Sequence, residues 1–304
     1  MIHVNMPSNI ALIKYMGKNA NQAPINSSLS LTIAHLYSSL TFKPANSDQL
    51  ITDVTLKPGG KENFIHHFQW LKSIFNIKDH FHILSENNFP SGAGLASSAS
   101  AYSALTKGTY LISQKLQTHS PLSMEEIARL SAKGSGSSIR SFFEPYCIWT
   151  KDGARAIGEN WPKLESCVAI IDAGHKKISS SEAHKRVISC PDIQERINRA
   201  NDRLSQLIRA FDQANWSFIY HICKDEFLDM HHLFHSCQAP FKYITSDSEE
   251  LISQADIIVK QGTKLIITMD AGPNVHFLYP PESQDAIQSL VNQYQKFPWR
   301  FSRV

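Results

Sequence analysis

Residues 87–100, "NNFPSGAGLASSAS", have almost no reactive side chains, but their small size suits a particular chemistry. Small residues let a backbone approach a ligand closely, and glycine allows several N–H groups to point into one concavity. A helical pattern begins at Ser97, and a helix N-terminus adds unpaired N–H groups and the positive end of its dipole. The stretch therefore predicts an anion site, most simply for phosphate, where the hydroxyls of Ser97 and Ser98 would donate to phosphate or ligate its Mg²⁺.

The stretch also has a purely structural interpretation. It lacks the GK[ST] of a P-loop and the GxGxxG of a dinucleotide-binding turn. A tight connection packed against its own sheet would use the same small residues.

Two further stretches contain charged residues in polar or turn-forming surroundings. "KGSGSSIRSFF" (133–143) is a second glycine–serine cluster with Arg140 in its middle, and "MDAGPNVHF" (269–277) places Asp270 at the end of an apolar strand. Alone, an arginine of this kind is usually a surface or ion-pair residue, and a strand-end aspartate is usually a turn or cap residue.

The small-residue stretch connects a predicted strand to a predicted helix. A helical apolar stripe precedes it, formed by Phe64, Phe68, Leu71 and Phe75. The short apolar-rich run "HFHILSE" then predicts a strand. Helical spacing returns beyond Ser97, through Tyr102, Leu105, Thr109 and Ile112. A capping box at Ser123 and Glu126 predicts the next helix, with Gly134 as its stop.

The second half of the chain is predicted to be mostly helical. Strands are expected at "YCIW" and "CVAIIDA", helices across 192–211, 216–234 and 248–261, and strands again at "KLIITMDAG" and "VHFLY". The elements mix without a regular βαβ rhythm. We therefore predict an α+β protein of two domains, 1–165 and 166–304.

Composition narrows the class of protein. The chain has 304 residues, 42% of them hydrophobic, and a formal net charge of only +3, which gives no reason to expect a nucleic-acid or membrane partner. Its five cysteines are scattered and form no CxxC pair, which indicates reduced thiols in a cytosolic protein. No apolar stretch is long enough for a signal peptide or a membrane span. We expect a soluble, cytoplasmic protein.

Five motifs in order resemble mevalonate diphosphate decarboxylase of the GHMP kinase superfamily. They are "SNIALIKYMGK", "PINSSLSLTI", "NNFPSGAGLASSASAYSAL", "GSGSSIRSF" and "DAGPN", and they run from near the N-terminus to Asn274. The resemblance implies a GHMP-kinase-like fold. Its N-terminal ribosomal-protein-S5-domain-2-like domain has a left-handed βαβ unit, and its C-terminal domain is ferredoxin-like, with ATP and substrate in the cleft between them.

The resemblance also implies the reaction. ATP phosphorylates the tertiary 3-hydroxyl of mevalonate 5-diphosphate, and loss of phosphate and CO₂ then gives isopentenyl diphosphate. Phosphorylation is needed because hydroxide is a poor leaving group and the substrate has no carbonyl to act as an electron sink. ATP and Mg²⁺ are the expected cofactors, and the expected assembly is a homodimer.

Site residues follow from the matched positions. Asp270 corresponds to the aspartate that orients or deprotonates the 3-hydroxyl, and Lys14 to a lysine beside it. Arg140 corresponds to the arginine that grips the substrate carboxylate, with Asn9 at the same site. The resemblance assigns the ATP phosphates to Ser91, Gly92, Ala93, Gly94, Leu95, Ala96, Ser97 and Ser98. It assigns substrate binding to Tyr15, Lys18, Ser135, Gly136, Ser137, Arg140 and Ser180.

The chain departs from the family's pattern mainly at the end that would bind the diphosphate. Ser181 stands where many members have arginine, and Glu182 adds a negative charge beside it. Met16 replaces a usual tryptophan, and Lys61 is the nearest match to another arginine. Glu144 and Pro145 replace a glycine pair.

Other functions remain as alternatives. A decarboxylase of another mevalonate phosphate would suit Ser181, and a superfamily kinase of the mevalonate 3-kinase type would phosphorylate without decarboxylating. A zinc or regulatory protein is suggested by a cluster after residue 222, comprising Cys223, His231, His232, His235 and Cys237. This cluster has no HExxH glutamate, and ordinary helix packing explains it more simply.

Overall fold

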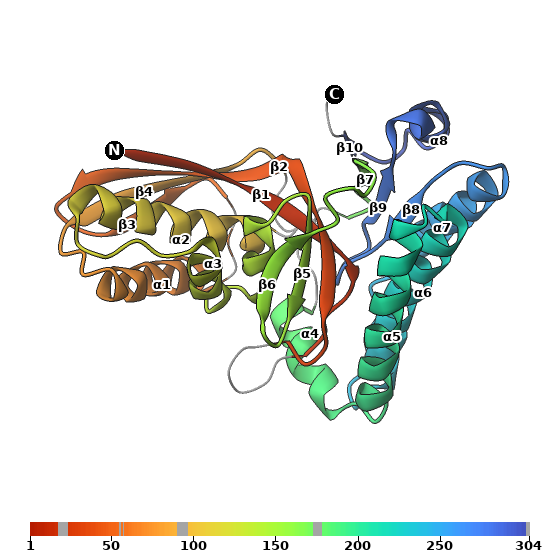
Figure 1. The fold of residues 1–304 in the computed structure, drawn as a ribbon, viewed down its shortest axis with the longest axis horizontal. Coiled ribbons are helices and arrows are strands. Elements are labelled where there is room, and N and C mark those ends of the chain that lie inside the picture. The colour runs from red at the N-terminus through yellow and green to blue at the C-terminus, as the bar shows by residue number, and fades with distance from the viewer. Residues whose placement is uncertain (18–23, 55, 57, 90–96, 173–177, 302–304) are drawn as a thin grey trace. The chain divides into compact units, whose positions relative to one another are not determined.

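The computed structural model describes residues 1–304 except 18–23, 55, 57, 90–96, 173–177 and 302–304 (Figure 1). The chain divides into two compact units. Unit 1 is Met1–Ile10 with Thr32–Ala156, and unit 2 is Ala11–Leu31 with Ile157–Val304. The predicted domains, 1–165 and 166–304, differ from these units chiefly in residues 11–31. These residues form the end of one long strand, the start of the next and the segment that joins them.

A six-stranded sheet contains those two long strands. They are β1 (Ile2–Ile13) and β2 (Ser28–Ala45), and each crosses from one unit to the other. The sheet has the order β3-β4-β2-β5-β6, with β1 also paired to β2. The shorter strands are β3 (Gln49–Thr52), β4 (His80–Asn87), β5 (Tyr146–Thr150) and β6 (Gly153–Ile157).

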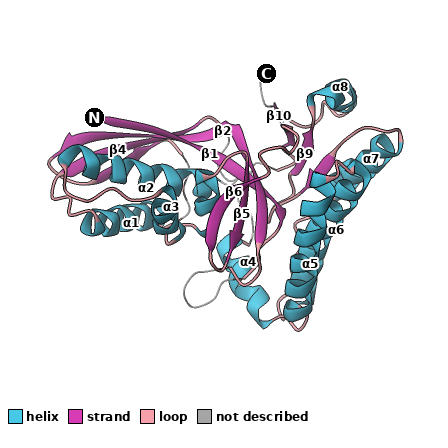
Figure 2. Ribbon diagram, viewed as in Figure 1, coloured by secondary structure: helices cyan, strands magenta, loops and turns pink. Residues whose placement is uncertain are grey.

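Three helices of unit 1 pack on this sheet (Figure 2). They are α1 (Gly60–Ile74), α2 (Ser97–Leu116) and α3 (Met124–Ala132). Helix α1 joins β3 to β4, which pair in parallel, and this makes a βαβ unit. The predicted stripe is buried on α1 and at its C-cap Phe75, and the Ser123–Glu126 capping box starts α3. Both predictions are confirmed.

The sheet of unit 2 is antiparallel, with four strands in the order β10-β7-β9-β8. The strands are β7 (Glu165–Ala169), β8 (Ile266–Thr268), β9 (Val275–Tyr279) and β10 (Trp299–Phe301). All residues of β9 are buried, because neighbouring strands pair on both sides and helices pack against its apolar residues.

Most of the regular secondary structure of unit 2 is helical, as expected. They are α4 (Ser180–Arg186), α5 (Ile193–Asp212), α6 (Trp216–Ser236), α7 (Ser246–Lys260) and α8 (Gln284–Gln293). The described residues also form 3₁₀ turns, η1 (Gly136–Phe142) in unit 1 and η2 (Val187–Ser189) and η3 (Pro281–Ser283) in unit 2. Helices α5 and α6 lie side by side, and α6 also contacts β8 (Figure 1).

The prediction of five reduced thiols is wrong for two of them. Cys190 and Cys237 form a disulfide, with their Cα atoms 4.7 Å apart. They are 47 residues apart in the sequence, and they meet because the turn after α4 packs against the C-terminal end of α6. Cys147, Cys167 and Cys223 are buried and take no part in this disulfide.

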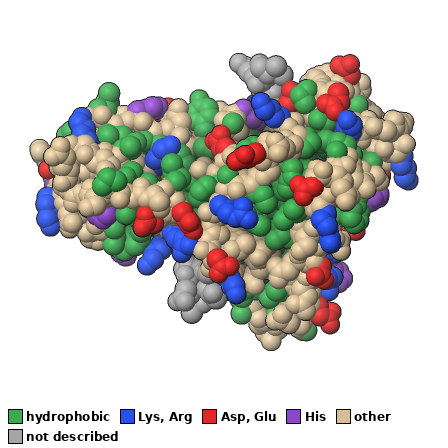
Figure 3. Space-filling model, in the orientation of Figure 1, with side chains coloured by type: hydrophobic (Ala, Val, Ile, Leu, Met, Phe, Trp, Pro, Cys, Tyr) green, Lys and Arg blue, Asp and Glu red, His purple; other side chains and the backbone are tan. Residues whose placement is uncertain are grey.

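One face of the molecule shows how its surface charges are distributed. On the face drawn in Figure 3, basic and acidic side chains are interspersed, as a net charge of +3 suggests. Among the described residues, no helix has the length and apolar character needed to cross a membrane.

Candidate active site

An ion pair in unit 2 joins the two residues predicted to act at the reacting hydroxyl. Lys14 Nζ donates to Asp270 Oδ1 at 2.7 Å. The lysine side chain is only 2% exposed, while the aspartate side chain is 26% exposed. The buried ammonium thus holds one carboxylate oxygen, while part of the Asp270 side chain stays accessible to a ligand.

The ends of two strands position this pair. Lys14 follows directly after β1, and Asp270 lies two residues beyond β8. The Thr268 hydroxyl donates to the Ala11 carbonyl at 3.3 Å, which ties the end of β8 to β1. Gly272 N–H donates to the Asp270 carbonyl at 2.7 Å and closes the turn.

Asn274 completes the "DAGPN" motif as a structural residue. It is buried, and its Oδ1 accepts hydrogen bonds from the N–H groups of Ile171 and Asp172 at 2.8 and 3.1 Å. The asparagine therefore fixes the start of β9 to the chain that leaves β7.

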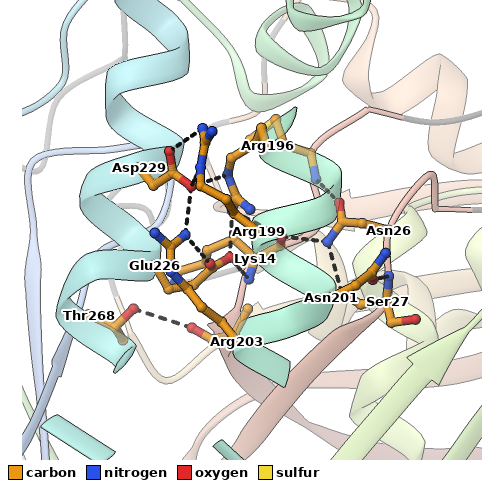
Figure 4. A network of polar contacts seen from close by, with 12 residues as sticks. Lys14, Asn26, Ser27, Arg196, Arg199, Asn201, Arg203, Glu226, Asp229 and Thr268 are labelled. Atoms are coloured by element: carbon orange, nitrogen blue, oxygen red, sulfur yellow. Dashed lines mark hydrogen bonds and ion pairs between the residues drawn. The ribbon is translucent and has the colours of Figure 1, made fainter. Parts of the chain in front are cut away.

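A network of arginines and carboxylates lies between α5 and α6, next to Lys14 (Figure 4). Asp229 accepts two hydrogen bonds from Arg199, at 2.8 and 3.0 Å, and one from Arg203 at 2.6 Å. Burial raises the pKa of Asp229, but these hydrogen bonds and the charge of Arg196 outweigh it, so the pKa lies below its usual value. Asp229 is therefore ionised near neutral pH.

Asn26, from the "PINSSLSLTI" motif, fastens the segment that contains Lys14. Its Nδ2 donates to the Lys14 carbonyl at 3.0 Å and its Oδ1 accepts from Met16 N–H at 3.3 Å. The oxygen and the nitrogen of this buried amide thus hydrogen-bond to the backbone on either side of Tyr15.

The segment expected to bind the diphosphate is held by a histidine from α4. The Tyr15 ring stacks on His184, with centroids 4.8 Å apart, and Gly17 N–H donates to His184 Nδ1 at 2.9 Å. Gly17 has φ of 94°, a backbone conformation that glycine adopts readily and other residues adopt only with strain. Lys18 lies outside the described residues.

Ser180 is the first residue of α4 and is exposed. Ser181 beside it is also exposed. Glu182, which adds a negative charge here, forms an ion pair with Arg186 at 2.9 Å. Its charge is thus partly balanced within the helix.

In unit 1, Asn9 and Arg140 are 1% and 3% exposed. Asn9 Nδ2 donates to the Ser137 carbonyl at 3.2 Å and to Ser141 Oγ at 2.8 Å. These partners flank Arg140 in η1, so Asn9 holds the turn that contains the arginine. The buried Oδ1 of Asn9 has no hydrogen-bond partner among the described residues, which leaves an acceptor for a ligand.

Three serine hydroxyls of unit 1 form a chain from the start of α2 to η1. Ser98 Oγ lies 3.4 Å from Ser135 Oγ, which lies 3.3 Å from Ser137 Oγ. Ser98 itself is exposed. The rest of the predicted phosphate loop, residues 91–96, lies outside the described residues, and Gly136 is buried at the start of η1.

Family comparisons agree with this arrangement. Residues 6–159 match the diphosphomevalonate decarboxylase-like N-terminal domain, and residues 166–301 match the mevalonate 5-diphosphate decarboxylase C-terminal domain. The chain belongs to the mevalonate diphosphate decarboxylase family. It is an enzyme with the two-domain α+β fold of the GHMP kinases, as predicted.

Individual relatives of the decarboxylase family cover almost the whole chain. Diphosphomevalonate decarboxylase from Saccharomyces cerevisiae is 28% identical over 95% of this chain and 80% of its own. The crystal structure of a mevalonate diphosphate decarboxylase from Legionella pneumophila is 38% identical, with a TM-score of 0.90 over 98% of this chain and 99% of that one. A structure of MDDEF in complex with MVAPP, AMPPCP and magnesium is 26% identical, with a TM-score of 0.86 over 99% and 98% of the two chains.

The sequence did not reveal every residue around the Lys14–Asp270 pair. Glu226 and Arg196 lie within predicted helices, and no motif in the sequence marked them as functional residues. His231 was noted only as a possible zinc ligand. In the structure His231 is buried and His235 exposed, and Cys237 is in the disulfide. No group of three or more metal-ligand side chains occurs in the described ranges.

Proposed function

We propose that this enzyme converts mevalonate 5-diphosphate and ATP to isopentenyl diphosphate, ADP, phosphate and CO₂. The ion pair between the buried Lys14 ammonium and the partly exposed Asp270 carboxylate is the observation that carries the proposal. A carboxylate fixed beside an ammonium at the end of a strand suits proton transfer and the stabilisation of charge on a phosphoryl group.

The first step is phosphoryl transfer to the 3-hydroxyl. Its oxygen attacks the γ-phosphorus of ATP, the bond to ADP breaks, and Asp270 accepts the hydroxyl proton. Lys14 holds the carboxylate in place and offsets negative charge on the transferred group. The accessible part of the Asp270 side chain leaves room for the substrate hydroxyl.

The second step is elimination with decarboxylation. The C3–O bond breaks, and phosphate leaves with the bonding electrons. Electrons of the bond between C2 and the carboxyl carbon form the new double bond, and CO₂ departs. Arg140 would grip the carboxylate before this step, and Asn9 would accept a hydrogen bond at the same site. The buried guanidinium, held in a turn that Asn9 fixes, supports this role.

The start of α2 suits the ATP phosphates. Ser98 has an exposed hydroxyl at the N-terminal turn of a 20-residue helix, where N–H groups and the helix dipole favour negative charge. Ser91–Ala96 and Ser97 are proposed to complete the phosphate site. These donors fit Mg-ATP, and Mg²⁺ would neutralise charge on the phosphates while bound mainly through their oxygens.

The diphosphate end is proposed to contact Tyr15, Lys18 and Ser180, with Ser135, Gly136 and Ser137 along the rest of the substrate. The Tyr15 ring stacks on His184, whose Nδ1 accepts from Gly17 N–H, and this fixed position of Tyr15 favours the assignment. A homodimer and a cytoplasmic location stay predictions.

A paired assay tests the proposal. Purified protein with Mg²⁺-ATP and mevalonate 5-diphosphate should release ADP and CO₂ in equal amounts. ADP without CO₂ would identify a kinase and remove the role given to Arg140. If neither product forms, mevalonate and its other phosphates are the substrates to assay, because Ser181 and Glu182 alter the diphosphate end.

A further inference from the structure

Helix α6 presents a buried face that contains two polar side chains. The buried residues of this face include Cys223, Phe227, Met230 and Phe234, at the three- and four-residue spacing of one helix side. Glu226 and His231 lie among them and are 0% and 3% exposed. A buried carboxylate and a buried imidazole are costly unless they are hydrogen-bonded, so their partners are informative.

Glu226 holds the backbone of Lys14 (Figure 4). Its Oε1 accepts from Lys14 N–H at 2.9 Å and also from Arg196 Nη2. Its Oε2 accepts from Arg203 at 3.1 Å. The arginines fix the orientation of the carboxylate, so the position of Lys14 N–H is defined by a rigid, charged support.

His231 holds the backbone of Asp270. Its Nε2 lies 3.1 Å from the Asp270 carbonyl oxygen. Burial and the charge of Lys14 lower the pKa of His231 to about 3, so the ring is neutral near pH 7. A carbonyl only accepts hydrogen bonds, so Nε2 carries the proton. The buried Nδ1 has no hydrogen-bond partner among the described residues, so the single N–H of the ring is used for Asp270.

We propose that Glu226 and His231 are positioning residues, which set the separation of Lys14 and Asp270 from one helix. The proposal rests on the function given to that ion pair. The two residues are five positions apart on α6, and each binds the backbone of one partner rather than its charged group. Because α6 is continuous, a shift of either strand end would break a buried hydrogen bond.

Two substitutions of His231 distinguish the effect of its N–H donor on the position of Asp270 from the effect of its ring on packing. His231→Phe keeps an aromatic ring against Phe227, Phe234 and Tyr243, which the native ring meets edge-on, but it removes the N–H donor. His231→Gln loses the ring and keeps an N–H donor near the Nε2 position. The same two substitutions at the exposed His232 are the matched controls.

We expect His231→Phe to lower kcat about 10- to 100-fold while KM for ATP changes less than about threefold, because misplaced groups slow the chemical step. His231→Gln should keep kcat within about threefold. A native-like kcat in folded His231→Phe, or an equal loss in folded His231→Gln, overturns the proposal. Should His231→Phe not fold, His231→Gln decides alone, and its own failure to fold also overturns the proposal.

Glu226 has a similar pair of variants. Glu226→Gln and Glu226→Leu both remove the negative charge, but only glutamine keeps an acceptor for Lys14 N–H. The leucine variant should have at least about tenfold lower kcat than the glutamine variant. Equal values overturn the role of Glu226. Should Glu226→Leu not fold, protection of Lys14 N–H from hydrogen exchange in Glu226→Gln supports the role, and fast exchange overturns it.

Amide hydrogen exchange gives a readout that needs no substrate. Gly272 N–H, which is bonded to the Asp270 carbonyl, should exchange faster in His231→Phe than in His231→Gln. If the unsubstituted protein does not decarboxylate mevalonate 5-diphosphate but the two variants still differ in Gly272 N–H exchange, the positioning role stands and the proposed function is rejected. Equal exchange rates in the two variants would reject the positioning role itself.

Discussion

At the scale of single residues, the two charged side chains of the ion pair differ in their exposure to solvent. Lys14 has its ammonium buried against one oxygen of Asp270, while the side chain of the aspartate remains partly exposed. A buried lysine paired in this way is costly to place, and its partner is costly to remove, because an unpaired charge would remain. The pair is therefore sensitive to changes that preserve shape and remove charge.

Asp270→Asn should lower kcat for ADP release at least about 100-fold, because an amide cannot accept the hydroxyl proton. Asp285→Asn, at an exposed carboxylate in α8, is the matched control and should leave kcat unchanged. Near-normal turnover in folded Asp270→Asn would contradict the assignment of this residue.

Arg140→Lys should lower kcat/KM for mevalonate 5-diphosphate about 100-fold. Lysine keeps the positive charge but loses the two parallel N–H donors that suit a carboxylate. Steady-state kinetics at saturating ATP provide the measurement, with the exposed Arg129→Lys as control. If Arg140→Lys matches its parent, the arginine does not grip the carboxylate.

At the scale of elements, strand ends and helix starts position the chemistry. Lys14 and Asp270 follow β1 and β8, and Ser98 lies in the first turn of α2. Backbone groups at such ends are free of regular pairing, so they can hold side chains or ligands. The N-terminus of α2 is thus suited to phosphates, whereas its interior packs against the sheet.

Ser98→Ala should raise KM for ATP about tenfold and leave KM for mevalonate 5-diphosphate within about twofold, because one hydrogen bond to a charged phosphate is lost. Ser205→Ala, an exposed helix serine in α5, should change neither constant. An unchanged KM for ATP in Ser98→Ala would show that this hydroxyl does not bind the nucleotide.

At the scale of the whole molecule, buried and half-buried histidines make the free energy of unfolding depend on pH. Burial, with the charges of His66 and Lys133, lowers the pKa of His67 to about 4. Burial also lowers the pKa of His35 to about 4 and, with the charge of Lys14, that of His231 to about 3. Each of these histidines is neutral in the folded protein at a pH where its unfolded form, with a pKa of about 6.5, is protonated.

Unfolding therefore takes up protons between about pH 6.5 and 4, so the free energy of unfolding falls as the pH falls through this window. Each fully buried histidine contributes a slope of up to about 1.4 kcal/mol per pH unit. In His67→Phe, urea unfolding measured at several pH values should show a shallower slope by up to that amount. His221→Phe, at an exposed position, should keep the parent slope. Equal slopes for His67→Phe and its parent would show that His67 does not titrate on unfolding.

The sequence by itself determined the elements with strong local patterns. The stripe of α1 and the capping box of α3 are periodic or short-range signals, and both occur where predicted. Strands β1, β2, β3, β6 and β10 were not predicted, although in β2 Leu29, Leu31 and Ile33 alternate with polar residues as in a strand. Five motifs in order also identified the family and predicted Lys14 and Asp270 as site residues, because only a few residue types can perform a given chemical step.

Only the tertiary structure showed how those residues are held. Glu226 and His231 lie more than 200 residues from Lys14 in the sequence, and Cys190 meets Cys237 across 47 residues. Helical periodicity predicts which residues face inward, but it does not reveal which distant backbone group each will contact. Packing of α6 against the ends of β1 and β8 decides that contact, because burial leaves each polar atom few partners other than the groups that folding brings beside it.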